Sequence, residues 1–194
     1  MKFDGIAGAP IAAIDVSIIG YTGRNTSPSV SYTDGEIDAG GSVTIKVKAW
    51  ADAGKTIPVL ANSPVSLVWS DWDATPNNGI PGGFSSSILN VNALGEAAVT
   101  FTPSTVKGDN FRVTAMGGGA VSNLATEILV IANSNTVGSY LVTAPATATA
   151  GMGFALTVKA YDAYGNLMDR YTNGTAANVT VTGLSNSPNG TAPT

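Results

Sequence analysis

Hydrophobic and polar residues alternate with a period of two over several stretches of this chain. In the clearest stretch, Val43, Ile45 and Val47 share one side. Lys46 and Lys48 share the other side. This alternation is typical of a strand that packs on a core with one face and meets water with the other. Because such stretches are separated by Gly, Pro, Asn, Asp and Ser, the chain is predicted to be all-β, as a sandwich or barrel.

The same pattern predicts further strands along the first two thirds of the chain. In one of them Val65, Leu67 and Trp69 share a side, so Trp69 is expected to lie in the core. Another, near the end of this region, is apolar on both sides, which is typical of a strand buried on both faces. The predicted strands are residues 43–50, 65–69, 87–91, 97–101, 111–115 and 125–131.

Two parts of the chain have similar sequences. Residues 40–54 and 151–165 align without a gap, and Val47-Lys48-Ala49 is repeated as Val158-Lys159-Ala160. The step from Val47 to Val158 is 111 residues. A single β-sandwich domain has about 100 residues, so this spacing indicates a tandem repeat of one such domain.

The repeat divides the chain into four parts. Residues 30–131 are predicted to form one complete domain, and residues 132–139 a short polar linker. Residues 140–194 are predicted to be an incomplete second domain, about 50 residues short on this spacing. Residues 1–29 carry an apolar strand, which we interpret as the end of a preceding domain or as a donor strand.

Half of a sandwich leaves its inner face and its strand edges open. Two explanations remain open at this point: the chain is a fragment of a longer protein, or subunits exchange strands. In the second, residues 6–19 of one subunit complete residues 140–194 of the next, and head-to-tail contacts extend into a fibre. The contacts expected with other copies are the open edge of 140–194 and the side chains Ile14, Val16, Ile18, Leu129 and Ile131.

Composition excludes many kinds of site. The 194 residues include no His and no Cys, so disulfides, thiolate or imidazole metal ligands, and Ser-His-Asp or Cys-His catalysis are impossible. Thirteen acidic and nine basic side chains leave a net charge of −4, which argues against nucleic acid as a partner. The chain also lacks the run of about 18 apolar residues that a membrane span needs. We expect no enzyme activity, no cofactor and no metal.

Several motifs resemble a known family. Residues 148–166 resemble the first half of bacterial immunoglobulin-like repeats of the invasin/intimin and filamin-like kinds. Residues 94–101 and 108–115 are similar to the closing half of such repeats. The resemblance implies an immunoglobulin-like β-sandwich in a surface-exposed spacer, adhesin or lattice protein, with domains joined like beads. It implies no shared catalytic residues.

Pattern and resemblance together lead to an expected function. We expect a non-enzymatic structural module of an extracellular or cell-surface array, self-assembling into a filament or lattice, with strand complementation between subunits as one route. The alternative is an adhesin-type binding module that recognises carbohydrate or a host protein through its loops.

Two acidic loops are candidate calcium sites. Asp162 and Asn166 flank Gly165, and Asn133 and Asn135 precede them in the linker. Oxygen ligands of this kind suit Ca²⁺, but the ligand spacing of an EF-hand is absent. A tight turn with Asx hydrogen bonds is therefore favoured here. The second acidic loop contains Asp71, Asp73, Asn77 and Asn78, and here a solvated loop after the strand at 65–69 is favoured over a calcium site.

Other candidate chemistry is weaker. Asp71 and Asp73 are a carboxylate pair of the kind that glycoside hydrolysis uses, and Trp50 with Trp72 is a candidate sugar platform. An isopeptide bond needs a buried Lys, but the periodicity places Lys46, Lys48 and Lys159 on the wet side. Sequons for N-glycosylation occur at Asn25, Asn173, Asn178 and Asn189.

Overall fold

The computed structural model describes residues 10–26, 31–73, 79–132, 137–149 and 152–168. Within these ranges no helix is long and apolar enough to cross a membrane. The strands in chain order are β1 (Ala13–Thr22), β2 (Glu36–Asp38), β3 (Ser42–Trp50), β4 (Pro64–Asp71), β5 (Gly83–Phe84), β6 (Ile88–Asn90), β7 (Glu96–Thr102), β8 (Asn110–Gly117), β9 (Ala120–Asn123), β10 (Ile128–Ile131), β11 (Ser139–Thr143) and β12 (Thr157–Tyr161).

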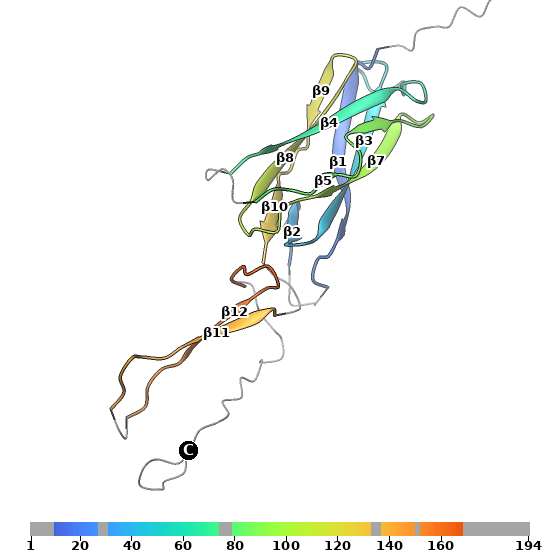
Figure 1. The fold of residues 1–194 in the computed structure, drawn as a ribbon. Helices are drawn as coiled ribbons and strands as arrows, with labels where there is room; N and C mark the ends of the chain where they lie inside the picture. The colour runs from blue at the N-terminus through green and yellow to red at the C-terminus, as the bar shows by residue number, and fades with distance from the viewer. Residues whose placement is uncertain (1–9, 27–30, 74–78, 133–136, 150–151, 169–194) are drawn as a thin grey trace, which may run out of the picture.

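The first ten strands form two sheets that pack face to face (Figure 1). One sheet has the order β1-β3-β7-β5, and all its pairs are antiparallel. The other has the order β2-β10-β8-β4-β6, in which β2 runs parallel to β10 and β9 pairs with β8. The predicted all-β sandwich is confirmed. Strands β11 and β12 form a separate two-stranded sheet, called here the hairpin.

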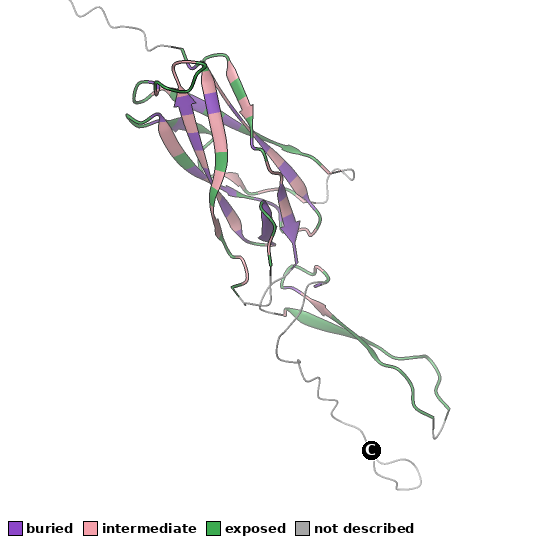
Figure 2. Ribbon diagram, turned by 180° about the vertical axis from the view of Figure 1, so that it is seen from behind, coloured by how far each residue is buried: buried purple, intermediate pink, exposed green. Residues whose placement is uncertain are grey.

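The core lies between the two sheets, where the alternating apolar residues meet (Figure 2). On β3, Val43, Ile45 and Val47 are fully buried, as their alternation predicts. Phe101 of β7 meets Phe111 of β8 edge to face, with ring centroids 5.8 Å apart. This aromatic pair joins the two sheets. Full burial of such a side chain contributes about 1.5–3 kcal/mol.

The N-terminal strand belongs to this same sandwich, which corrects our interpretation of residues 1–29. β1 pairs with β3 over nearly its whole length, with Ile14 opposite Ala49. Ile14 is buried in the core, and Val16 and Ile18 pack against it. Periodicity predicted the strand correctly but could not reveal its partner, because strand pairing joins residues far apart in sequence. A strand that fills its own core is not free to be donated.

Strand β10 is covered mainly by its own chain. It lies between β2 and β8, and Ile128, Val130 and Ile131 are buried, while Leu129 is partly exposed. The prediction that this strand is buried on both sides is correct for three of these four residues. Ile131 is therefore not free to contact another copy, contrary to our expectation.

Trp69 is not a core residue, contrary to the prediction. Val65 and Leu67 are buried as expected, but Trp69 is 40% exposed at the far end of β4. One edge of its ring meets Phe111 at a centroid distance of 5.9 Å. The indole also approaches Gly83 of β5, which has no side chain to cover it. Alternation predicted the side of the strand on which Trp69 lies but not how much of the side chain is covered there.

Candidate functional site

The hairpin repeats the backbone pairing of β1 and β3. Ala12 N–H donates to the Trp50 carbonyl at 2.8 Å, and Gly138 N–H donates to the Tyr161 carbonyl at 2.8 Å. On the other side of β3, the N–H of Val59, in the segment between β3 and β4, donates to the Ala49 carbonyl at 3.2 Å. The corresponding bond joins Met168 N–H to the carbonyl of Ala160, at 2.9 Å. The two aligned sequences thus adopt the same local arrangement.

The apolar side of the hairpin is exposed (Figure 2). Val142 is paired with Val158, and Tyr140 with Ala160, so these side chains share one face. Phe154 and Leu156 lie just before β12 and continue the apolar alternation of the sequence, and both are exposed. We call this surface the hairpin face; its large side chains are Tyr140 (52% exposed), Val142 (55%), Phe154 (57%), Leu156 (43%) and Val158 (37%).

Among the described residues, one edge of β12 is open as far as Ala160, whose carbonyl is taken by Met168. In the sandwich, β3 lies between β1 and β7, and its Ala49 N–H donates to the Gly95 carbonyl beside β7. Among the described strands, β12 pairs with β11 alone, and at its end Tyr161 forms an isolated bridge with Leu167. The Ala160 carbonyl accepts the N–H of Met168, so it points away from β11. By the period of two, the backbone groups of Val158 point the same way. We call this the β12 edge.

The charged residues on the outer side also correspond. Lys48 lies opposite Glu96 of β7, with Nζ 3.2 Å from the carboxylate, and Lys46 Nζ lies 3.7 Å from it. The hydrogen bond from Lys48 holds the pKa of Glu96 below its ordinary value. Lys159, which aligns with Lys48, has no ion pair within the described part of the chain. All three lysines lie on the outer side of their strands, as predicted, where an isopeptide bond has no buried lysine to use.

Asp162 and Asn166 form a joint between the hairpin and the sandwich. The carboxylate of Asp162 accepts hydrogen bonds from Tyr164 N–H at 2.9 Å and from the N–H and side chain of Asn166, each at 2.8 Å. Asn166 in turn accepts from Lys107 N–H at 2.9 Å and donates to the Thr105 carbonyl at 2.8 Å. These bonds tie the turn to the loop that precedes β8.

A second contact closes the joint. The ring of Tyr164 lies against Gly40, where the hydroxyl occupies the space that a β-carbon would need. Gly40 also has a positive φ of 82°, so a larger residue is disfavoured there for two reasons. The Lys107 ammonium adds a hydrogen bond to the Leu167 carbonyl, at 3.3 Å.

The carboxylate oxygens of Asp162 thus accept hydrogen bonds within a turn, which is the interpretation that the sequence favoured. Gly165 has a φ of 85° in this turn. Within the described ranges, no three acidic side chains come together as a metal site would need. The other candidate ligands Asn77, Asn78, Asn133 and Asn135 lie outside the described residues, as do the sequons at Asn173, Asn178 and Asn189.

The structure separates the two tryptophans of the predicted sugar platform. Trp50 lies at the end of β3 that pairs with Ala13, and its indole donates to Asp15 at 2.9 Å. Trp72 follows β4 in the other sheet, beyond the pairing of Asp71 with Phe111. The two rings therefore lie on different sheets and at opposite ends. In the acidic loop, Asp73 N–H donates to the Asp71 carboxylate at 3.3 Å.

Trp72 instead stacks with Arg112, a contact that the sequence did not predict. The guanidinium carbon lies 3.3 Å from the ring centroid, and Arg112 also pairs with Glu127 at 3.2 Å. The ring is still 48% exposed. Arg112 lies on β8 and Trp72 directly follows the adjacent strand β4, so only the register of β4 and β8 brings them together.

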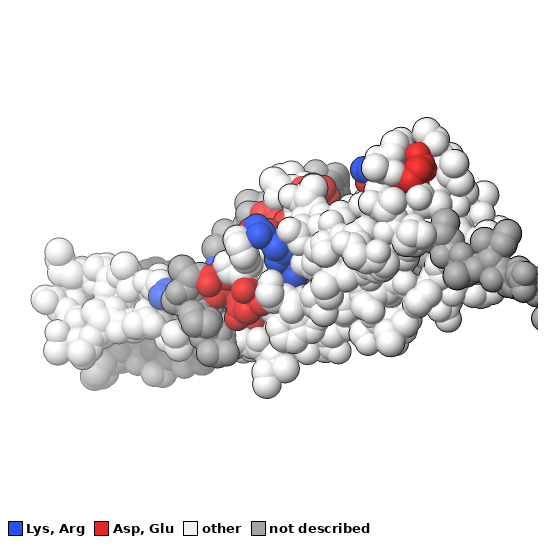
Figure 3. Space-filling view, turned by 90° about the horizontal axis from the view of Figure 1, so that it is seen from above, with Lys and Arg blue, Asp and Glu red and all other residues white. Residues whose placement is uncertain are grey.

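A polar cluster lies where the chain crosses between the sheets. Arg24 stacks on Tyr21 and Tyr32, with centroid distances of 3.2 and 4.7 Å. Burial, with a hydrogen bond to Asp38, raises the pKa of Tyr32; Asp34 has a lowered pKa because Tyr21 donates to it. Figure 3 shows a mostly uncharged face on which acidic and basic groups lie side by side in small groups. The sequence did not predict the cluster of Arg24 with Tyr21 and Tyr32.

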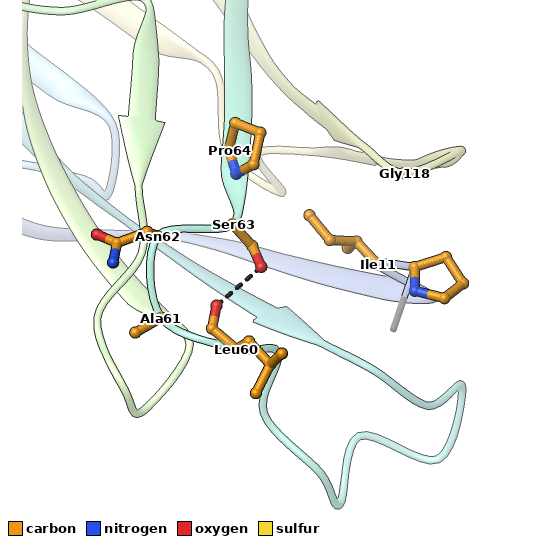
Figure 4. Close-up of a pocket in the computed structure, with 8 residues that line it drawn as sticks. Ile11, Leu60, Ala61, Asn62, Ser63, Pro64 and Gly118 are labelled. Carbon is orange, nitrogen blue, oxygen red and sulfur yellow. Dashed lines mark hydrogen bonds between the residues drawn. The ribbon is translucent and has the colours of Figure 1, made fainter. Parts of the chain in front are cut away.

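A pocket opens at the end of the sandwich that is remote from the hairpin (Figure 4). It has a volume of about 430 Å³ and is lined by Pro10, Ile11, residues 60–64 and Gly118. Its polar groups are uncharged, and the Ser63 hydroxyl donates a hydrogen bond to the Leu60 carbonyl at 2.8 Å. Three separate segments form it, so no local sequence signal could have predicted it.

Comparison with known proteins adds no relative. No protein-family model matches this chain, and no curated protein is significantly similar to it.

Proposed function

We propose that this chain is a non-enzymatic structural module of an extracellular or cell-surface array that self-assembles through the hairpin. The strand orders support an immunoglobulin-like module. The order β1-β3-β7-β5 corresponds to strands ABED of an immunoglobulin sandwich, and β10-β8-β4 corresponds to GFC. Folds of this kind serve many functions, so the function is argued from the hairpin.

The exposed hairpin face is the observation that carries this proposal. A two-stranded hairpin is marginally stable in water without a partner for its apolar side. Each large apolar side chain contributes about 1.5–3 kcal/mol on full burial, and five such side chains here remain between 37% and 57% exposed. Contiguous apolar patches of this kind mark interaction sites.

The occupant in this proposal is a second copy of the chain, packed hairpin face against hairpin face. Each hairpin face then covers an equivalent face, as the inner faces of two sheets do in a sandwich. β1 fills its own sandwich, so donation of β1 to a neighbour is no longer part of the proposal.

Sedimentation velocity and negative-stain electron microscopy of the full chain, over a range of concentrations, test this proposal. We expect concentration-dependent dimers, because a contact between two equivalent faces closes at two copies; larger ordered particles need a second contact on each copy. The double variant V142D/V158D places two charges in the face and should weaken association at least tenfold. T157D is the matched control, because Thr157 lies on the other side of β12. A chain that stays monomeric at every concentration contradicts the proposal.

A second candidate function is supported by Trp72. We propose as the alternative an adhesin-type module that binds carbohydrate at this exposed, Arg-stacked ring. Quenching of tryptophan fluorescence on titration with a panel of hexoses tests it. Wild type should respond, while W72A should not respond and W50F should behave as wild type.

A further inference from the structure

The open β12 edge has a specific counterpart elsewhere in the molecule. In the sandwich, the equivalent edge of β3 is occupied by β7, with Val47 opposite Ala97, Ile45 opposite Val99 and Lys48 opposite Glu96. β3 and β12 have aligned sequences, matching backbone hydrogen bonds and a lysine at the same position on the outer side. They therefore present the same backbone and side-chain groups to an incoming strand.

We propose that the β12 edge accepts an extended strand from another polypeptide chain, with a carboxylate opposite Lys159 and apolar residues at alternate positions. This inference rests on the proposed function, since it names a second contact by which the hairpin assembles. The hairpin face takes a covering sheet, whereas the β12 edge takes a strand into its own sheet. Main-chain hydrogen bonds supply the affinity of such an added strand.

Charge complementarity defines the chemistry of this partner. Glu96 lies opposite Lys48 and also neutralises Lys46, so one carboxylate of β7 serves two lysines of β3. On β12, the residue equivalent to Lys46 is Thr157, which leaves Lys159 as the single cation. An incoming strand therefore needs one acidic residue on its outer side, and the register follows from where that residue lies.

The apolar pattern of the partner follows from the inner side of the sheet. Ala97, Val99 and Phe101 of β7 continue the apolar surface of β3. A strand of this kind beside β12 would extend the hairpin face by one strand. Three strands with a common apolar face meet the requirement for independent stability that two strands do not.

A peptide experiment tests this proposal on the full chain. The probe is a peptide of residues 94–103, which contains β7 with its Glu96. Amide hydrogen exchange is followed by NMR, with Val158 and Ala160 as reporters and Val47 as a control within the sandwich. At monomeric concentrations these two amides should exchange rapidly, and the peptide should slow them at least tenfold while Val47 stays unchanged.

A charge exchange tests the register. The E96K peptide should bind the wild-type chain about threefold more weakly, in line with a surface ion pair. It should regain affinity for the K159E chain, which in turn should bind the original peptide more weakly. Equal binding in all four combinations overturns the assigned carboxylate and register.

Two further results overturn the proposal. One is slow exchange of Val158 and Ala160 in the monomer without peptide, because the chain's own segments then occupy the edge. The other is exchange that no peptide slows. If the chain associates in sedimentation but the peptide has no effect, this inference fails and the proposed function stands. If the peptide binds but the chain remains monomeric, the proposed function fails and this inference stands.

Discussion

Strand β3 of the sandwich and strand β12 of the hairpin differ mainly in what surrounds them. They have aligned sequences, an antiparallel partner on the same side and matching hydrogen bonds at their ends. Val47 of β3 is nevertheless fully buried, while Val158 of β12 is 37% exposed. A second sheet covers β3, whereas no described strand covers β12. The two strands therefore form the same local structure. Whether their apolar side chains are buried depends on a second sheet, which the sequence of the strand does not itself specify.

The largest effect should come from placing one charge in each of the two aligned strands. V47D buries an unpaired carboxylate, so it should cost the sandwich more than about 4 kcal/mol or prevent folding. V158D should change the unfolding free energy of the sandwich by less than about 0.5 kcal/mol, because Val158 is outside its core. Urea denaturation followed by tryptophan fluorescence measures both.

A milder variant keeps this comparison measurable if V47D does not fold. V47A should destabilise the sandwich by about 2 kcal/mol through the lost apolar contacts and the cavity left behind, and V158A should have almost no effect. Equal losses at the two positions would show that the hairpin shares the sandwich core, and would contradict the comparison.

A smaller effect is expected at the joint between the two regions. N166A removes the side-chain hydrogen bonds to Lys107 and Thr105, each worth about 1 kcal/mol, and should free the hairpin to reorient. Residual dipolar couplings of the hairpin amides should shrink relative to those of the sandwich, with sandwich stability unchanged. N123A, which loses one exposed hydrogen bond in β9, should leave the couplings as they are.

The smallest effect concerns the dependence of sandwich stability on pH. A hydrogen bond from Lys55 holds the pKa of Asp15, on β1, below its ordinary value of 3.8. Because the folded pKa is lowered, the contribution is complete above pH 3.8 and is lost as the pH falls through the folded value. This pair is partly exposed, so the contribution should stay below about 1 kcal/mol.

Denaturation curves between about pH 6 and pH 2.5 check this sign. Wild type should lose more stability on acidification than D15N, and the two curves should converge at the acid end. A D15N variant with the same acid sensitivity as wild type would show that Asp15 contributes nothing to the pH dependence.

Much of the fold could be predicted from sequence because alternation reports directly on strand sides. Val43, Ile45 and Val47 are buried, and Lys46 and Lys48 face out, as the period of two requires. The errors concern contacts between residues far apart in sequence. The pattern could not show that β1 pairs with β3, nor that Trp69 near the end of β4 stays 40% exposed.

The candidate site was predicted only in part, for the same reason. The open edge in residues 140–194 was expected from the aligned segments, and so was the apolar side of residues 154–160. The joint was not, although Asn166 was singled out as a turn residue. Its partners Lys107 and Thr105 lie about sixty residues away, and only the packed sandwich brings them to it.

By itself, the amino-acid sequence determined which segments become strands, which side of each is apolar and which two segments adopt the same backbone pairing. These properties depend on neighbouring residues, whose side chains point alternately to the two faces of a strand. The tertiary structure decided which strands pair, which apolar sides are covered and which remain open on the hairpin. Those outcomes depend on the free energy of bringing distant segments together, which no local pattern contains.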